Sequence, residues 1–243
     1  MRRYPGGYLS STRHPWPCLL FLLPLLLAYE AGVLLLGGPQ AETLRNGADA
    51  WLRWGLDAFG LHQLYWAPGL IIGIFLAWSW LRVWDRPDFT LGICAGMAVE
   101  SVLFAVGLWA LSREIGPLLS EWGIRLSVKP TNQAVNRVVT FVGAGIYEEM
   151  LFRLLLFWAL GFFFRVIGTF SLLAAILTTI TSAVLFSAAH HIGPYGEPFN
   201  RYIFFFRMLA GLYFALLYQL RGFGIAVGTH ACYDVIVGVL MVQ

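Results

Sequence analysis

Three ionisable side chains lie within six residues of one another in an otherwise apolar segment, GAGIYEEMLFRLLLFWAL. Glu149 and Arg153 are four residues apart, so on a helix they share one face, with the acid on the N-terminal side, which is the better orientation for an ion pair. Glu148 is rotated about 100° from Glu149 and is out of register with the arginine. The pattern predicts that Glu149 and Arg153 neutralise each other and that Glu148 is left available as a general base. A salt-bridged helix contact without catalysis would explain Glu149 and Arg153 but not Glu148.

Two further apolar segments contribute histidines. The segment SAVLFSAAHHIGPYG places Phe186 four residues before His190. A lone histidine near a membrane boundary is more often a hydrogen-bonded interfacial residue than a catalyst, and His190 by itself would be interpreted in that way. The segment GTHACYDVIVG contains His230 and Asp234, which are four residues apart and share a face of one helix. These two side chains are therefore within hydrogen-bonding reach of each other or of a common ligand.

The free-energy cost of placing these ionisable residues in apolar helices favours one shared site. Each ionisable group inside a membrane-spanning helix costs at least about 2.5 kcal/mol and is by default a functional hypothesis. We expect the three segments to converge, because a common buried site removes the cost of leaving each group exposed to lipid. The predicted site residues are Glu148, Glu149, Arg153, His190, His230 and Asp234.

The composition identifies the solvent around these helices as a lipid bilayer. Of the 243 residues, 59% are hydrophobic and only 12% are charged, whereas soluble domains have about 25% charged residues. The high hydrophobicity and the net charge of +3 argue against disorder, and the lack of clustered basic residues argues against nucleic-acid binding. Three cysteines without paired spacing suggest neither a disulfide framework nor a cysteine zinc site. The chain is predicted to be an integral, multi-pass membrane protein, in the plasma or inner membrane if it is prokaryotic.

Seven apolar runs have the length of transmembrane helices, since a bilayer core of about 30 Å requires about 20 residues per helix. They cover approximately residues 17–36, 66–84, 90–111, 140–163, 168–190, 203–220 and 223–241. The predicted fold class is therefore all-α, a polytopic membrane helical bundle with about seven transmembrane helices. The basic residues of the loops divide seven to seven between the two sides, so the positive-inside rule does not decide the topology. The three arginines before the first run, Arg2, Arg3 and Arg13, favour a cytoplasmic N-terminus.

The connection between the first two runs has a pattern of its own. Asp49, Arg53 and Asp57 follow one another at intervals of four residues, and neighbouring tryptophans and leucines supply apolar surface. This pattern is typical of an amphipathic helix that lies in the membrane interface. An ordinary connecting helix explains it equally well.

The three polar motifs resemble those of the CPBP family, the intramembrane proteases that include the type II CAAX prenyl endopeptidases. The motifs are EExxxR at residues 148–153, FxxxH at residues 186–190 and HxxxD at residues 230–234. The stretch FFRMLAGLYFALLYQLRGFGIAVGTH also looks like the segment that precedes the last motif in the family. The resemblance covers about residues 138–238. It divides one membrane domain into N-terminal transmembrane helices and loops at residues 1–137 and a CPBP-like catalytic core at residues 138–243.

The resemblance implies an intramembrane endopeptidase that uses water as its nucleophile. Glu148 would act as general base and, with His190, would hold and activate a water that attacks a peptide carbonyl. His230, with Asp234, would polarise the carbonyl and stabilise the tetrahedral oxyanion. Many family members carry asparagine where this chain has Asp234. An ionised aspartate cannot donate a hydrogen bond, so a donor role for Asp234 requires a protonated side chain, and the alternative is that it orients His230.

No cofactor is expected, although zinc has to be weighed. Members of the family were long described as metalloproteases, and two carboxylates with two or three histidines could ligate Zn²⁺. The HExxH motif is absent, however, and a metal-free glutamate mechanism is favoured over a zinc metalloprotease. In that mechanism Glu149 and Arg153 would fix the helix and its charge.

The expected partners are the lipid bilayer and a membrane-embedded or lipid-modified protein or peptide, cleaved near its C-terminus, with no nucleic acid. The resemblance is compatible with prenylated CAAX proteins, bacteriocin precursors and proteins with a C-terminal sorting helix as substrates. An ion-coupled transporter is the alternative from another class, because intramembrane glutamate, histidine and arginine also build proton relays. It would favour inverted repeats, and the sequence has no such symmetry. A non-proteolytic immunity or binding member of the same family is the third alternative.

Overall fold

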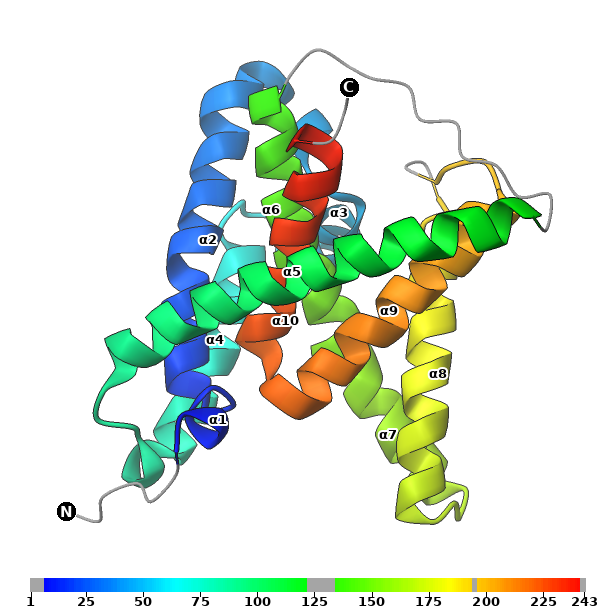
Figure 1. Ribbon diagram of the computed structural model, residues 1–243. Coiled ribbons are helices and arrows are strands. Elements are labelled where there is room, and N and C mark those ends of the chain that lie inside the picture. The colour runs from blue at the N-terminus through cyan, green and yellow to red at the C-terminus, as the bar shows by residue number, and fades with distance from the viewer. Residues whose placement is uncertain (1–6, 122–133, 194–195, 241–243) are drawn as a thin grey trace.

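Every secondary-structure element that the structure describes is helical, which confirms the predicted all-α bundle. The structure is a computed structural model that describes residues 7–121, 134–193 and 196–240 (Figure 1). Its α-helices are α1 (Tyr8–Ser11), α2 (Pro15–Gly37), α3 (Gly47–Asp57), α4 (Trp66–Leu81), α5 (Thr90–Glu121), α6 (Ala134–Glu149), α7 (Leu156–Val166), α8 (Ser171–Ala189), α9 (Arg201–Arg221) and α10 (Phe223–Val235). Shorter 3₁₀ segments are η1 (Gly38–Leu44) and η2 (Val83–Asp85), and π-helical segments are η3 (Met150–Leu155) and η4 (Ile236–Leu240).

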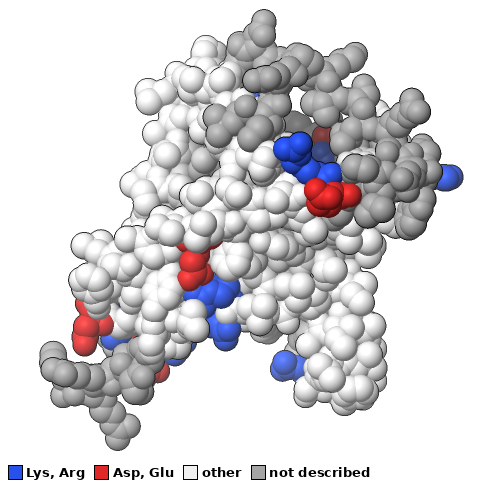
Figure 2. All heavy atoms as spheres, viewed as in Figure 1, with Lys and Arg blue, Asp and Glu red and all other residues white. Residues whose placement is uncertain are grey.

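Four of the described helices are long and apolar enough to cross a membrane. They are α2, the Thr90–Glu114 part of α5, α8 and α9. Helix α4 and the segment Phe223–Val239, which begins with α10, are apolar but shorter. Uncharged residues cover most of the face shown in Figure 2, and charged residues gather at only a few places on it. These features agree with a multi-pass membrane protein, and the count of seven spans stays a prediction.

Helices α2, α6 and α10 run side by side, and α5 crosses α10 (Figure 1). Two glycines let α6 approach both neighbours. A Cβ atom at Gly145 would lie 2.8 Å from the backbone nitrogen of Ala231 in α10, and one at Gly143 would overlap the ring of Tyr29 in α2. Small residues permit such close helix contacts in membranes. The C-terminal end of α6 is thereby held next to α10.

The fourth apolar run is interrupted by a π turn. Residues 140–163 were expected to form one regular span, but the structure inserts η3 between α6 and α7, directly after Glu149. A π turn inside a helix is rare and is frequently found at functional sites. The EExxxR motif therefore lies where the helix changes its winding.

One face of helix α3 packs against α4 and α6, whereas Trp54 on the same helix is 48% exposed. Asp49 has no exposed surface. Its carboxylate is paired with Arg45 and Arg53, at 2.7 Å each, and this pairing offsets the cost of burying a charge. Residues 47–57 thus form the expected helix, and its location in the membrane interface stays a prediction.

Candidate active site

The carboxylate of Glu148, in the last turn of α6, faces two imidazoles. Its Oε2 atom lies 3.6 Å from Nε2 of His190 and 3.7 Å from Nε2 of His230. Both separations are longer than a direct hydrogen bond, and polar atoms this far apart commonly interact through a water. The structure thus brings together one residue from each of the three predicted segments, α6, the end of α8 and α10.

The contacts of the two Nδ1 atoms orient both imidazoles. Nδ1 of His190 lies 2.8 Å from the carbonyl oxygen of Phe186. Because a carbonyl oxygen only accepts hydrogen bonds, this nitrogen carries the proton and donates it. Nδ1 of His230 lies 2.8 Å from Oε1 of Glu149, a carboxylate acceptor. Both Nε2 atoms are consequently left facing the same space, in front of Oε2 of Glu148.

Aromatic rings pack against both imidazoles. The ring of Phe186 packs edge-on against His190, with 5.0 Å between ring centroids, and the ring of Phe214 stacks on His230 at 4.4 Å. These contacts restrict rotation of both histidines. The phenylalanine of the FxxxH motif therefore supports the histidine of the same motif with its backbone carbonyl and with its ring.

Glu149 lies behind His230 and is fully buried. Its Oε2 atom is 3.2 Å from Nε of Arg153, so the predicted pair of the motif is present. Arg153 is also fully buried. It donates from Nη2 to the carbonyl oxygen of Gly211 at 2.9 Å, and its guanidinium lies 4.4 Å above the ring of Phe186. Glu149 thus links the arginine to the histidine and orients His230.

Asp234 lies beside His230 and its side chain is partly exposed. Its Oδ2 atom lies 3.5 Å from Nε2 of His230, the same nitrogen that faces Glu148. Since Glu149 already occupies Nδ1 of that ring, Asp234 does not orient His230 through Nδ1. The aspartate and Glu148 instead approach the same nitrogen of His230.

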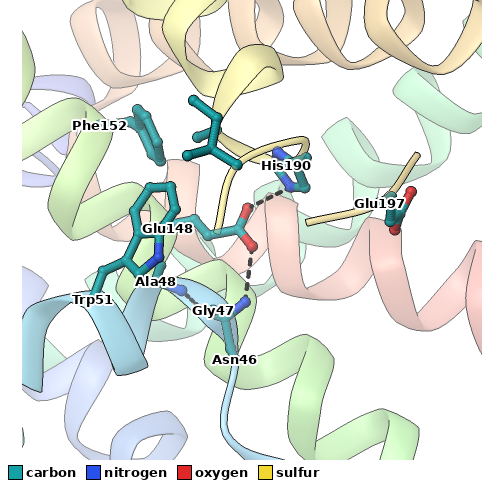
Figure 3. A pocket seen from close by; sticks show the side chains of 10 residues that line it. Asn46, Gly47, Ala48, Trp51, Glu148, Phe152, His190 and Glu197 are labelled. Atoms are coloured by element: carbon teal, nitrogen blue, oxygen red, sulfur yellow. Dashed lines mark hydrogen bonds and ion pairs between the residues drawn. The ribbon is translucent and has the colours of Figure 1, made fainter. Parts of the chain in front are cut away.

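A pocket of about 120 Å³ opens beside Glu148 (Figure 3). A buried water needs only about 10–15 Å³ by this measure, so the pocket has room for more than one water or for part of a peptide. Trp51 and Phe152 form aromatic walls, and Glu197 lies on the far side of His190 from Glu148 (Figure 3). The lining residues are Asn46, Gly47, Ala48, Trp51, Glu148, Phe152, Ala189, His190, Ile192 and Glu197.

Residues 130–236 match a family model described as "Type II CAAX prenyl endopeptidase Rce1-like". This part of the chain is CAAX-protease-like. The match includes all three motifs and agrees with the resemblance seen in the sequence. With the four apolar helices, it makes the chain an integral membrane protein and, in general terms, an intramembrane protease. No curated protein and no solved structure matches the chain.

Asn46 is a residue of this CAAX-protease-like site that sequence reasoning missed. Its Nδ2 atom donates to Oε1 of Glu148 at 2.8 Å from a position 102 residues earlier in the chain (Figure 3). An asparagine in front of a helical pattern indicates an N-cap, and nothing in the local sequence indicates a contact with Glu148. Asn46 also lies outside the residues that match the family model.

Side chains that could bind zinc are not grouped in the part of the chain that the structure describes. Among those residues, no group of three or more histidine, cysteine, aspartate or glutamate side chains could hold a metal ion. A mechanism without a cofactor stays a prediction.

Proposed function

We propose that this chain is a glutamic-type intramembrane endopeptidase in which Glu148 activates the attacking water. The observation that carries the proposal is the position of Oε2 of Glu148, 3.6 Å and 3.7 Å from the Nε2 atoms of His190 and His230. A water between Oε2 and Nε2 of His190 would be held by both groups and would lie at the mouth of the pocket. General-base catalysis requires this placement of base and water.

In the proposed reaction, Glu148 takes a proton from the water as the oxygen attacks the peptide carbonyl carbon. The carbonyl oxygen becomes an oxyanion, and a protonated His230 stabilises it by donating from Nε2. Glu149 accepts from Nδ1 of that ring, and a neighbouring carboxylate favours the protonated form of the imidazole. Glu148 then returns its proton to the leaving nitrogen as the C–N bond breaks. The products are a new carboxylate end and a new amine.

The proposed substrate is a membrane-associated protein or peptide that is cleaved near its C-terminus. Support comes from the description of the matched family, prenyl endopeptidases, and from the apolar helices around the site. Prenylated CAAX proteins, bacteriocin precursors and proteins with a C-terminal sorting helix all satisfy this chemistry. A panel of three reporters, one from each class, would identify the preferred substrate.

The decisive experiment compares Glu148→Gln with the wild-type protein in liposomes that contain a prenylated peptide reporter. We expect cleavage to be abolished while folded yield is unchanged, because the amide cannot take up a proton. Glu114→Gln is the matched control, since Glu114 is exposed on α5 and does not line the pocket. Full activity of Glu148→Gln would reject the proposal. Proton or solute flux that depends on Glu148 without any peptide product would favour a transporter instead.

A separate measurement addresses the metal-free part of the proposal. Protein purified without chelators is analysed for zinc and then assayed before and after dialysis against a chelator. We expect substoichiometric zinc and unchanged cleavage. Stoichiometric zinc that is lost in His190→Ala would overturn the metal-free mechanism.

A further inference from the structure

Asn46 and Glu148 meet through a buried hydrogen bond between distant parts of the chain. Nδ2 of Asn46 donates to Oε1 of Glu148 at 2.8 Å, and each residue is only 8% exposed. We propose that Asn46 is a positioning residue that holds one oxygen of Glu148 and thereby selects the other, Oε2, as the base. This inference rests on the proposed function, in which Glu148 activates the water.

The amide of Asn46 has only one orientation that satisfies its surroundings. Its Oδ1 atom caps helix α3 by accepting from the backbone nitrogens of Ala48, at 2.7 Å, and of Asp49, at 3.2 Å. With Oδ1 fixed by the cap, Nδ2 has to point towards Glu148. A flipped amide would set an oxygen against the carboxylate and an NH₂ group against two N–H donors. The helix cap therefore fixes the donor that faces the base.

This donor determines how the carboxylate of Glu148 is presented. The last torsion of a glutamate side chain is broad and does not by itself distinguish the two oxygens. Because Asn46 occupies Oε1, the oxygen that faces both histidines is Oε2. A hydrogen bond to a carboxylate also favours its ionised form, which is the form that accepts a proton from water.

Asn46 is also bonded to a buried polar network formed by Tyr29, Asp49, Arg45 and Arg53. Its backbone nitrogen donates to the hydroxyl of Tyr29 at 3.2 Å, and that hydroxyl donates to Asp49 at 2.8 Å. Asp49 is in turn paired with Arg45 and Arg53. Buried ion pairs seldom add stability beyond what apolar packing would give. The network therefore orients the start of α3 and does not need to add stability.

The same network is tied to α6 one residue before the base. The hydroxyl of Tyr147 donates to Oε1 of Glu30 at 2.6 Å, and Glu30 also contacts Arg53 at 3.2 Å. Glu30 of α2 thus connects α3 and α6 next to Glu148. Residues before the family-matched segment complete the site, so the matched core alone lacks one of its contacts.

The test separates the two roles of Asn46, the helix cap and the donor to Glu148. Aspartate and serine cap helices about as well as asparagine does. Asn46→Asp keeps the cap, removes the donor and adds a like charge against Glu148. Asn46→Ser keeps the cap, and its hydroxyl is too short to replace the donor. Asn200→Asp is the matched control, since Asn200 caps α9 through Ile203 and does not line the pocket.

Cleavage of the liposome reporter and thermal unfolding are measured for all three variants and for Glu148→Gln. We expect kcat to fall about 10- to 100-fold in Asn46→Asp and Asn46→Ser, the range expected for losing a hydrogen bond to a charged group, with KM changed less than about twofold. In both Asn46 variants the acidic limb of the pH–rate profile moves to higher pH, because the carboxylate of Glu148 is protonated more easily without the donor. The shift is larger in Asn46→Asp, which adds a like charge. Asn200→Asp keeps the wild-type kcat and profile.

Three outcomes of these measurements would contradict the expectations. Wild-type kcat and pH profile in Asn46→Asp and Asn46→Ser, with Glu148→Gln inactive, would overturn the positioning role and leave the proposed function standing. Loss of folded protein in both variants would assign Asn46 to the fold alone and would also overturn it. An active Glu148→Gln would reject the proposed function itself.

Discussion

Nδ1 of His230 lies 2.8 Å from Oε1 of Glu149, a residue 81 positions earlier in the chain. The two adjacent glutamates of the EExxxR motif therefore reach opposite nitrogens of the same imidazole, Glu149 at Nδ1 and Glu148 at Nε2. Neighbouring positions on a helix point about 100° apart, and this divergence lets one acid face the pocket while the other lies behind the ring. Each glutamate of the motif thus has its own contact with His230.

Glu149→Gln is expected to lower both stability and activity. It leaves the charge of Arg153 buried without its partner, and breaking a buried ion pair costs about 3–5 kcal/mol. The double variant Glu149→Leu with Arg153→Met removes both charges and should recover most of the folded yield, since apolar replacement of a buried pair is often neutral. Its cleavage activity should stay low because His230 has lost the acceptor at Nδ1. Thermal unfolding and reporter cleavage measure the two effects separately. A double variant with normal activity would show that Glu149 does not orient the histidine.

Asp234→Asn is expected to keep or raise kcat, whereas Asp234→Ala should lower it about 10-fold, the effect of removing one hydrogen-bonding group. Asp234 lies 3.5 Å from Nε2 of His230. An asparagine at this position can donate to an oxyanion, and an ionised aspartate cannot. The measurement is kcat for both variants with the same reporter. A loss in Asp234→Asn as large as that in Asp234→Ala would mean that the negative charge is what the reaction requires.

The sequence is sufficient to predict contacts within one helix and the convergence of costly side chains. Charged residues stand out in apolar runs, and the four-residue spacing of Glu149 and Arg153 directly implies the pair that the structure has at 3.2 Å. The contact between Glu149 and His230 could not be predicted in this way. It depends on how closely α6 approaches α10, which a glycine in α6 permits and which no periodicity within either helix encodes.

The N-terminal contribution was missed for a related reason. Asp49 and Arg53 show the same spacing whether their helix lies in an interface or is buried with its charges paired. The partners of these two charges, Arg45 for Asp49 and Glu30 for Arg53, come from other elements. Asn46 is identifiable only as a helix cap, because its contact with Glu148 joins two helices that are distant in the sequence. Arg153 sets Met150–Leu155 apart and predicts an ion pair, but nothing in this segment predicts a π turn.

Gly145→Ala is expected to destabilise the protein and to lower activity. The added methyl would lie 2.8 Å from the backbone nitrogen of Ala231, and backbone cannot move aside as a flexible side chain can. Overpacking of this kind costs about 1–3 kcal/mol, and it would push Glu148 away from His230. Gly73→Ala in α4 is the matched control, since a Cβ there meets nothing within 4 Å and alanine is the better helix former. Unfolding temperature and kcat are compared for both variants. An unchanged Gly145→Ala would show that α6 and α10 have room to separate without loss.

Glu197 supplies a pH-dependent contact at the rim of the pocket. It pairs with Arg207 at 2.9 Å, and the hydrogen bond from that guanidinium holds the pKa of Glu197 below its usual range. A lowered pKa in the folded state contributes stability above the usual glutamate pKa, and this contribution is lost as pH falls through the lowered value. The side chain of Glu197 is 49% exposed, so the contribution at neutral pH is at most about 1 kcal/mol. Wild-type protein should therefore unfold at a slightly higher temperature than Glu197→Gln at pH 7, and the two should converge in acid, below the lowered pKa. A difference that persists or grows in acid would contradict an ion pair as its source.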